Sequence, residues 1–109
     1  MHQYTVAFST AGSEAEAQTL AREMVTRGAA ACVTIIPKVC SYYKWKGKLC
    51  EDTECLLMIK TQANKKAAIE TLFKEKHSYD VAELILLPIE GGHQEYLDWI
   101  RSSLATEDS

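Results

Sequence analysis

A chain of 109 residues has the length of one domain, and its 47% apolar and 25% charged residues are ordinary for a soluble globular protein. The formal charge of -3 argues against broad nucleic-acid binding, because phosphate backbones are held by clustered lysine and arginine. The strongly apolar runs at 56–59 and 84–89 are far shorter than a bilayer span, and residues 1–10 do not resemble a signal peptide. We therefore expect a single domain over residues 1–109 that is cytoplasmic.

The N-terminal quarter of the chain predicts a strand followed by a helix. Residues 3–10 alternate large apolar side chains with small ones, which is typical of a half-buried strand. Ser13 and Glu16 have the spacing of a capping box, and apolar residues then recur at helical spacing as far as Gly28, which favours a left-handed stop. A helix over residues 14–27 is expected.

Residues 30–61 read as one long β-hairpin that turns at Lys46–Gly47. Each arm of about 14 residues would span about 46 Å, whereas a compact domain of this length has a diameter of about 34 Å. The tip must therefore project. Pro37 lacks an N–H group, so it marks a bulge or an edge position in the first arm. Because a projecting hairpin has unpaired edges, we expect another chain to pair with it.

The hairpin contains all four cysteines of the chain, which are Cys32, Cys40, Cys50 and Cys55. None has the CxxC spacing of a redox pair or a zinc site. For a two-residue turn, the expected facing pairs are Cys40 with Thr53, Cys50 with Tyr43, and Cys55 with Lys38. Since no two cysteines face each other, we expect free thiols on half-buried strands, with metal or redox chemistry as the alternative.

The next segment predicts a second helix over residues 65–76, capped by Asn64. Glu70 and Lys74 have the spacing of an ion pair on its exposed side. Its inward face is expected to contain Ala68, Ile69, Leu72 and Phe73.

A strand over residues 81–89 and a terminal helix complete the chain, and Gly91–Gly92 separate them. Residues 105–109 are expected to fray. One face of the terminal helix contains His93, Leu97, Ile100 and Leu104.

The element order is βαββαβ with a further C-terminal helix, which predicts a ferredoxin-like α+β fold with an antiparallel sheet. This fold hosts many unrelated activities. The first βα loop, residues 9–13, has neither the cysteines of a metallochaperone nor the arginine of an acyl-phosphate hydrolase. Residues 50–55 carry three carboxylates where an RNA-recognition module would place stacking aromatics.

Catalytic groups are not suggested by the sequence. The serines do not lie near a histidine in any elbow-like context, and the carboxylate pairs Glu51–Asp52 and Glu107–Asp108 fall on a solvated strand and the tail. We therefore expect no enzyme activity.

Four segments in one order and spacing carry a family resemblance: AACVTIIPKVCSYYKWKGK, ECLLMIKT, HSYDVAEL and LPIEGGHQEYLDWI. They resemble the CutA family, the divalent-cation tolerance proteins, over the stretch from Val6 to Ile100. The resemblance implies a ferredoxin-like homotrimer in which strands pair between subunits. It also implies a role in the response to metal ions.

The resemblance extends to a candidate metal site. Some members bind copper through a cysteine that ends the first strand and a His-His pair that ends the second helix, and these positions here are Ser9, Lys76 and His77. His77 is therefore the candidate ligand for Cu²⁺ or another divalent metal. Further ligands could come from a neighbouring subunit or from Cys32, Cys40 and Asp80. The alternative is that His77 ends a helix as a cationic imidazole stabilised by the helix dipole.

A second candidate site is a cleft between subunits that holds a small polar ligand. The residues expected to line it are Tyr43, Trp45, Glu54, Lys60, Tyr79, Glu83, Tyr96 and Trp99. Lys60 would attract an anion, the carboxylates would accept hydrogen bonds or hold a hard metal, and the rings would form walls. The alternative is interface packing by the aromatic side chains, with Lys60 and Glu54 as a structural ion pair.

These features favour a trimeric cytoplasmic divalent-cation tolerance protein that has no enzyme activity and is a candidate for copper binding. Its expected partners are further copies of itself and a metal ion or small ligand, without nucleic acid or membrane. One alternative is a small-metabolite sensor, by analogy with trimeric nitrogen-regulatory signal proteins that bind ligands between subunits. Another is a trimeric scaffold that anchors a second protein.

Overall fold

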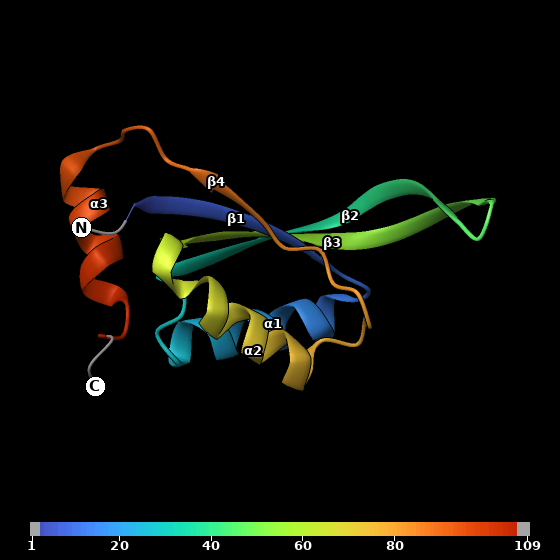
Figure 1. The fold of residues 1–109 in the computed structure, drawn as a ribbon, viewed down its shortest axis with the longest axis horizontal. Helices are drawn as coiled ribbons and strands as arrows, with labels where there is room; N and C mark the ends of the chain where they lie inside the picture. The colour runs from blue at the N-terminus through green and yellow to red at the C-terminus, as the bar shows by residue number, and fades with distance from the viewer. Residues whose placement is uncertain (1–2, 107–109) are drawn as a thin grey trace.

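The computed structural model describes residues 3–106. Its strands form one antiparallel sheet in the order β2-β3-β1-β4, and helices α1 and α2 lie on one face of it (Figure 1). The predicted ferredoxin-like α+β fold is confirmed. The elements are β1 (Tyr4–Ala11), α1 (Glu14–Thr26), β2 (Cys32–Trp45), β3 (Lys48–Gln62), the single 3-10 turn η1 (Ala63–Lys65), α2 (Lys66–Lys76), β4 (Ile85–Pro88) and α3 (Gln94–Ser103).

The ribbon formed by β2 and β3 projects beyond the rest of the sheet, as predicted. β1 pairs with β3 only as far as Cys55, so residues 48–54 pair with β2 alone. The described chain measures 44 × 28 × 22 Å, and the ribbon extends past the end of β1 along the longest direction (Figure 1). Lys46 and Gly47 form the tip with φ angles of 52° and 79°, as a two-residue hairpin turn of this kind requires.

The strand register agrees with the prediction near the tip and shifts further down. Cys40 and Cys50 have the predicted partners, whereas Cys55 lies opposite the bulge of Pro37 and Lys38 and is not paired with Lys38 alone. A bulge between Ile36 and Val39 shifts the register there, because Pro37 has no N–H group for the ladder. The prediction of a bulge on an edge strand is confirmed, and all four cysteines are free thiols.

The second helix differs from the prediction in three details. It begins at Lys66, and the N-cap position belongs to Lys65 rather than Asn64, because the preceding 3-10 turn places Asn64 inside a turn. Ala68 is exposed, since the larger apolar residues of α2 set which face is buried. Glu70 forms its ion pair with Lys66 at 3.5 Å instead of with Lys74.

The last strand is shorter than the predicted 81–89. Only residues 85–88 pair with β1, and residues 77–84 form a loop that runs from the end of α2 to the start of β4. This loop, the α2–β4 loop, connects α2 to the edge strand β4 and contains several of the predicted site residues. Residues 107–109 of the predicted frayed tail, including Glu107 and Asp108, lie outside the described residues.

Two apolar clusters form the core. The main cluster fills the space between the two helices and the inner face of the sheet, and its largest fully buried side chains are Leu20, Met24, Leu57, Ile59, Ile69 and Leu72. The smaller cluster lies under α3, at the end of the sheet away from the ribbon tip (Figure 1), and contains Ala31, Leu97, Ile100 and Leu104. Three of the four predicted face residues of the terminal helix are therefore buried, while His93 is exposed at the N-cap.

The outer face of the sheet, which points away from the helices, is mostly apolar, although Lys60 and Thr34 also lie on it. The pairs Val6–Leu87 and Phe8–Ile85 share this face, because paired residues across strands point the same way. Ile85 and Leu87 are 51% and 47% exposed, and both strands at the sheet edges have an open side within the described chain. We define the outer face by its half-exposed or exposed apolar residues Val6, Phe8, Leu56, Met58, Ile85 and Leu87.

Gly28 ends α1 as predicted, and the C-terminal segment packs directly against it. The φ angle of Gly28 is 73°, and the N–H of Ala105 donates a hydrogen bond of 3.0 Å to the Gly28 carbonyl. The buried Lys65 donates a second bond to the Ala105 carbonyl. Ala105 is therefore held in place, contrary to the predicted fraying at this position.

A Gly28→Ala substitution is expected to destabilise the protein by about 2–3 kcal/mol, because alanine disfavours positive φ and its Cβ overlaps a neighbour. The added Cβ would lie 2.6 Å from the backbone nitrogen of Ala105. Gly47→Ala is the matched control, since its φ is 79° but nothing lies within 4 Å, and about 1 kcal/mol is expected there. Urea unfolding of both variants measures the difference, and equal losses would contradict the close packing at Gly28.

Candidate functional site

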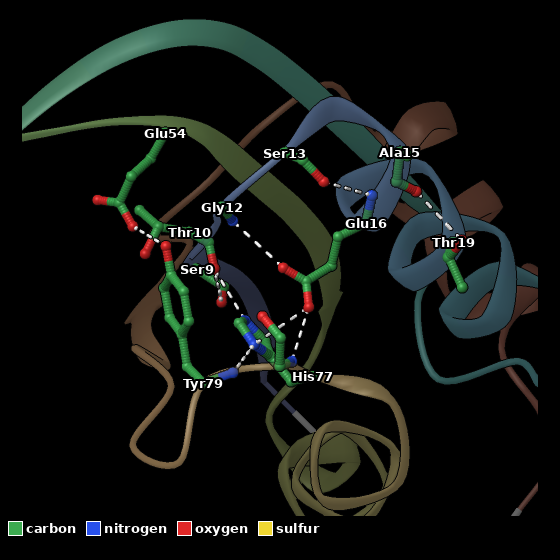
Figure 2. A network of polar contacts seen from close by, with 11 residues as sticks. Ser9, Thr10, Gly12, Ser13, Ala15, Glu16, Thr19, Glu54, His77 and Tyr79 are labelled. Carbon is green, nitrogen blue, oxygen red and sulfur yellow. Dashed lines mark hydrogen bonds and ion pairs between the residues drawn. The ribbon is translucent and has the colours of Figure 1, made fainter.

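His77 lies at the C-terminal end of α2, where it joins the α2–β4 loop to the end of β1 (Figure 2). Its side chain is completely buried. Nε2 lies 2.9 Å from the carbonyl oxygen of Thr10, and Nδ1 accepts a hydrogen bond of 3.1 Å from the N–H of Tyr79. Because a carbonyl only accepts, Nε2 is the nitrogen placed to donate to Thr10, while Oε2 of Glu16 lies 3.9 Å from Nδ1. His77 therefore ends the helix as expected.

Glu16 of α1 completes this network. Oε1 accepts from the N–H of Gly12 at 3.2 Å, and Oε2 accepts from the N–H of Ser78 at 2.6 Å (Figure 2). Burial alone would raise the pKa of Glu16, but the hydrogen bonds from Ser78 and Gly12 outweigh it, so the pKa lies below its ordinary value. The predicted capping box is half present, because Ser13 accepts from the Glu16 N–H while the Glu16 carboxylate binds Gly12 and Ser78.

A Glu16→Gln substitution is expected to reduce the loss of stability in acid. Because the pKa of Glu16 in the folded protein lies below its ordinary value, the ionised carboxylate stabilises the fold above that ordinary value and ceases to do so as the pH falls through the folded pKa. Urea unfolding at about pH 6 and about pH 3 should therefore give a smaller difference for the variant than for the wild type. Glu14→Gln, an exposed residue in the same helical turn, is the control. If Glu16→Gln loses as much stability in acid as Glu14→Gln, ionisation of Glu16 does not contribute to the pH dependence of stability.

Tyr79 extends the network from His77 to the ribbon. Its hydroxyl donates a hydrogen bond of 2.7 Å to Oε2 of Glu54 on β3 (Figure 2). Burial and the adjacent Glu54 carboxylate raise the pKa of Tyr79 well above its ordinary value, so the phenol remains a donor. Gly12 packs against this ring, because a Cβ there would lie 3.3 Å from the Tyr79 hydroxyl. The α2–β4 loop is thus fixed to β1, α1 and β3 at once.

A cleft of about 630 Å³ lies between this loop and the ribbon, and we call it the ribbon cleft. Tyr43 and Trp45 line it from β2, and Tyr43 donates a hydrogen bond to the Asp52 carboxylate. That bond, with burial and the nearby negative charge, raises the pKa of Tyr43 to about 12. The residues of the predicted cleft that line this one are Tyr43, Trp45, Glu54, Tyr79 and Glu83.

The remaining residues of the predicted intersubunit cleft lie elsewhere on the single chain. Nζ of Lys60 lies 3.9 Å from Sγ of Cys32 and donates to the Thr34 hydroxyl, near the start of β2. Tyr96 and Trp99 stack on α3, with ring centroids 5.5 Å apart. The proposed ion pair of Lys60 with Glu54 is not formed within residues 3–106.

Several residues of the network and the cleft were not selected by sequence reasoning. Ser78 and the Thr10 carbonyl bind through backbone atoms, which leave no signal in the choice of side chain. Asp52 had a signal, because the predicted register places it diagonally across the hairpin from Tyr43. Asp80 was considered as a metal ligand, and it lines the ribbon cleft.

Metal ligation has little support from side-chain clustering. Among residues 3–106, no group of three or more histidine, cysteine, aspartate or glutamate side chains could hold a metal ion. Both ring nitrogens of His77 already have hydrogen-bonding partners, so a metal there would have to displace one of them.

Among residues 3–106, no helix is both long and apolar enough to cross a membrane.

The fold and the site together define a class: a ferredoxin-like protein whose long β2–β3 ribbon forms a cleft with a loop fixed by His77 and Tyr79. Residues 5–103 match the family model described as CutA1 divalent ion tolerance protein. The chain belongs to this family.

Relatives and solved structures agree with the family match. The Divalent-cation tolerance protein CutA of Thermus thermophilus is 41% identical over 98 residues, which cover 90% of this chain and 95% of the relative. The human Protein CutA is 45% identical over 97 residues, covering 89% of this chain but 54% of the relative, and a Xenopus laevis homologue is 47% identical with 64% of its length covered. The matched part of the chain thus spans 54% and 64% of the length of these two animal relatives.

Two solved structures illustrate the similarity in three dimensions. The divalent cation tolerance protein of Thermus thermophilus superposes with a TM-score of 0.91 at 39% identity, covering 94% of this chain and 99% of the other. CutA1 of Oryza sativa superposes with a TM-score of 0.92 at 38% identity, covering 95% of both chains.

Proposed function

We propose that this protein is a self-associating, non-enzymatic binding protein in the cellular response to divalent cations, and that it works in the cytoplasm as a homotrimer. The outer face carries the proposal, since Ile85 and Leu87 are about half exposed on a surface that no other element among residues 3–106 covers. An exposed apolar patch of this kind is typical of an interaction surface. The family resemblance suggests three subunits.

The ribbon and the sheet edges support self-association independently. A two-stranded ribbon without a third strand is only marginally stable in water, and open edges favour pairing with another chain. Light scattering coupled to size exclusion tests the proposal, with an expected mass of three times the 12.2 kDa chain. A stable single chain at micromolar concentration would refute it.

We also propose that the protein binds copper and that His77 is one of the ligands. His77 has two internal hydrogen bonds, so binding would require one of them to break and further ligands to come from another subunit. Calorimetric titration with Cu²⁺ should give weak binding that His77→Ala abolishes and that His93→Ala, an exposed histidine, leaves unchanged. If the wild type gives no heat above buffer, or if His77→Ala binds equally well, His77 is not a ligand.

A second candidate function is the sensing of a small metabolite in the ribbon cleft. The volume of about 630 Å³ suits a small molecule, and the nearly buried Glu54 in its lining supports a specific polar contact. Native mass spectrometry after incubation with a cell extract should then detect a small adduct on the assembled protein. A protein adduct would instead favour the scaffold function.

A further inference from the structure

We propose that the end of the ribbon in one copy of this chain binds the exposed side of α3 in the next copy. This inference rests on the proposed self-association and adds a second contact to it, separate from the outer face of the sheet. The partner is a further copy of the same chain, and the contact has a direction, because the ribbon end and the helix are different surfaces.

The end of the ribbon is cationic and partly apolar, and we call residues 44–49 the basic tip. All six residues are exposed, and they include three lysines but no carboxylate. Trp45 and Leu49 are 59% and 75% exposed, at a point where β2 and β3 pair only with each other. Large apolar side chains surrounded by polar ones are typical of a surface that a partner covers. The lysines are Lys44, Lys46 and Lys48.

The exposed side of α3 has the opposite charge, and we call Glu95, Tyr96, Asp98 and Trp99 the α3 patch. The two rings stack and are nearly half exposed. Glu95 is one helical turn from Trp99 and forms no ion pair within residues 3–106. Asp98 lies 3.5 Å from the Arg101 guanidinium in an exposed pair, which contributes little. A cationic and apolar partner would therefore meet both carboxylates and ring faces.

The basic tip and the α3 patch lie at opposite ends of the molecule, so they cannot meet within one chain. α3 packs on the end of the sheet away from the ribbon, and the described chain is 44 Å long in this direction (Figure 1). Complementary surfaces at opposite ends form a head-to-tail contact when further copies are added. Such contacts produce a closed ring if the rotation between copies closes, and a ring of three agrees with the proposed homotrimer.

The ribbon cleft is the competing acidic surface for the basic tip. Trp45 of the tip itself lines that cleft, so a tip bound in the cleft of a second copy would bring two basic tips together. Like charges at close range oppose this arrangement. The carboxylates of Glu23 and Glu75 are a poorer alternative, because both pair with Arg27.

Carbodiimide cross-linking of the full chain, followed by peptide mass spectrometry, tests the contact directly. This reagent joins lysine to carboxylate without a spacer, so it cannot connect the tip to α3 across the length of one chain. Links from Lys46 or Lys48 to Glu95 or Asp98 are expected in the assembled protein. Links from the tip to the ribbon-cleft carboxylates instead, or no link to α3, would overturn the inference.

Charge reversal tests whether the contact stabilises the assembly. Lys46→Glu with Lys48→Glu reverses the tip, and Glu95→Lys with Asp98→Lys reverses the α3 patch. At low ionic strength, each double variant should exchange subunits with isotope-labelled assemblies at least about tenfold faster than the wild type, because like charges then face each other. The chain with all four substitutions should recover most of the slow exchange.

Arg22→Glu with Lys76→Glu is the matched control, because it makes the same change of charge at exposed positions of α1 and α2. Native mass spectrometry should detect no change of exchange rate for this control. Fast exchange of the fourfold variant would overturn the pairing of tip and helix. A wild-type protein that is a single chain by light scattering would refute self-association itself, whereas a trimer without tip-to-helix links would refute only this contact.

Discussion

A Leu87→Asp substitution is expected to convert the assembled protein into single chains. Leu87 lies on β4 within the outer face, beside Val6, and is 47% exposed in the single chain. In an assembly that buries this face, each subunit would have to desolvate the new carboxylate at a cost of at least about 2–3 kcal/mol. In the single chain the side chain stays in water, so folding should change by less than about 1 kcal/mol.

Light scattering measures this effect, and far-UV circular dichroism checks the fold. Val25→Asp is the matched control, because Val25 is 44% exposed on α1, in the helical layer on the other side of the sheet. The control should retain the mass of the wild type. An assembly that survives Leu87→Asp would show that the outer face is not the interface.

A His77→Ala substitution is expected to destabilise the fold by about 3–5 kcal/mol. The change removes a fully buried ring and leaves the Thr10 carbonyl and the Tyr79 N–H without their partner. The ring also packs edge-on against Phe73, with centroids 5.1 Å apart, so a cavity would form beside the core. Chemical denaturation provides the measurement.

Two further variants separate the contributions to that loss. His77→Phe retains a ring in the cavity but removes both hydrogen bonds, and about 2–3 kcal/mol is expected. His93→Ala removes an exposed histidine at the N-cap of α3, where the side chain makes no capping bond, and should cost less than about 0.5 kcal/mol. Similar losses for His77→Ala and His93→Ala would mean that the buried network does not stabilise the protein.

The hairpin illustrates what could be predicted from local sequence. The turn at Lys46–Gly47 and the pairing near the tip follow from a two-residue turn, because facing positions are then determined by counting. The bulge at Pro37 was also predictable, although its effect on the partner of Cys55 was not. Counting residues from the turn no longer gives the pairing partners on the other side of a bulge, since the strand register there depends on how the whole sheet packs.

The candidate site shows the limit of this reasoning. Lys60 and Glu54 are both on β3, and sequence reasoning placed them in one cleft or one ion pair. Within the single chain they have different neighbours, because only residues 48–54 of β3 project beyond β1 and line the ribbon cleft with the α2–β4 loop, while a cleft between subunits stays a prediction. The course of that loop was unpredictable, since it depends on hydrogen bonds from His77, Ser78 and Tyr79 to distant residues.

The amino-acid sequence alone thus determined the order of the elements, the long hairpin and the family, because periodicity, turn residues and motif spacing are local properties of the chain. Only the tertiary structure decided the hydrogen-bonding partners of His77, the partner of Glu54 and the acidic character of the ribbon cleft. These features depend on contacts between residues far apart in the sequence. Such contacts form where β1, β3 and the α2–β4 loop pack together, and no local sequence pattern determines which of these distant segments contact each other.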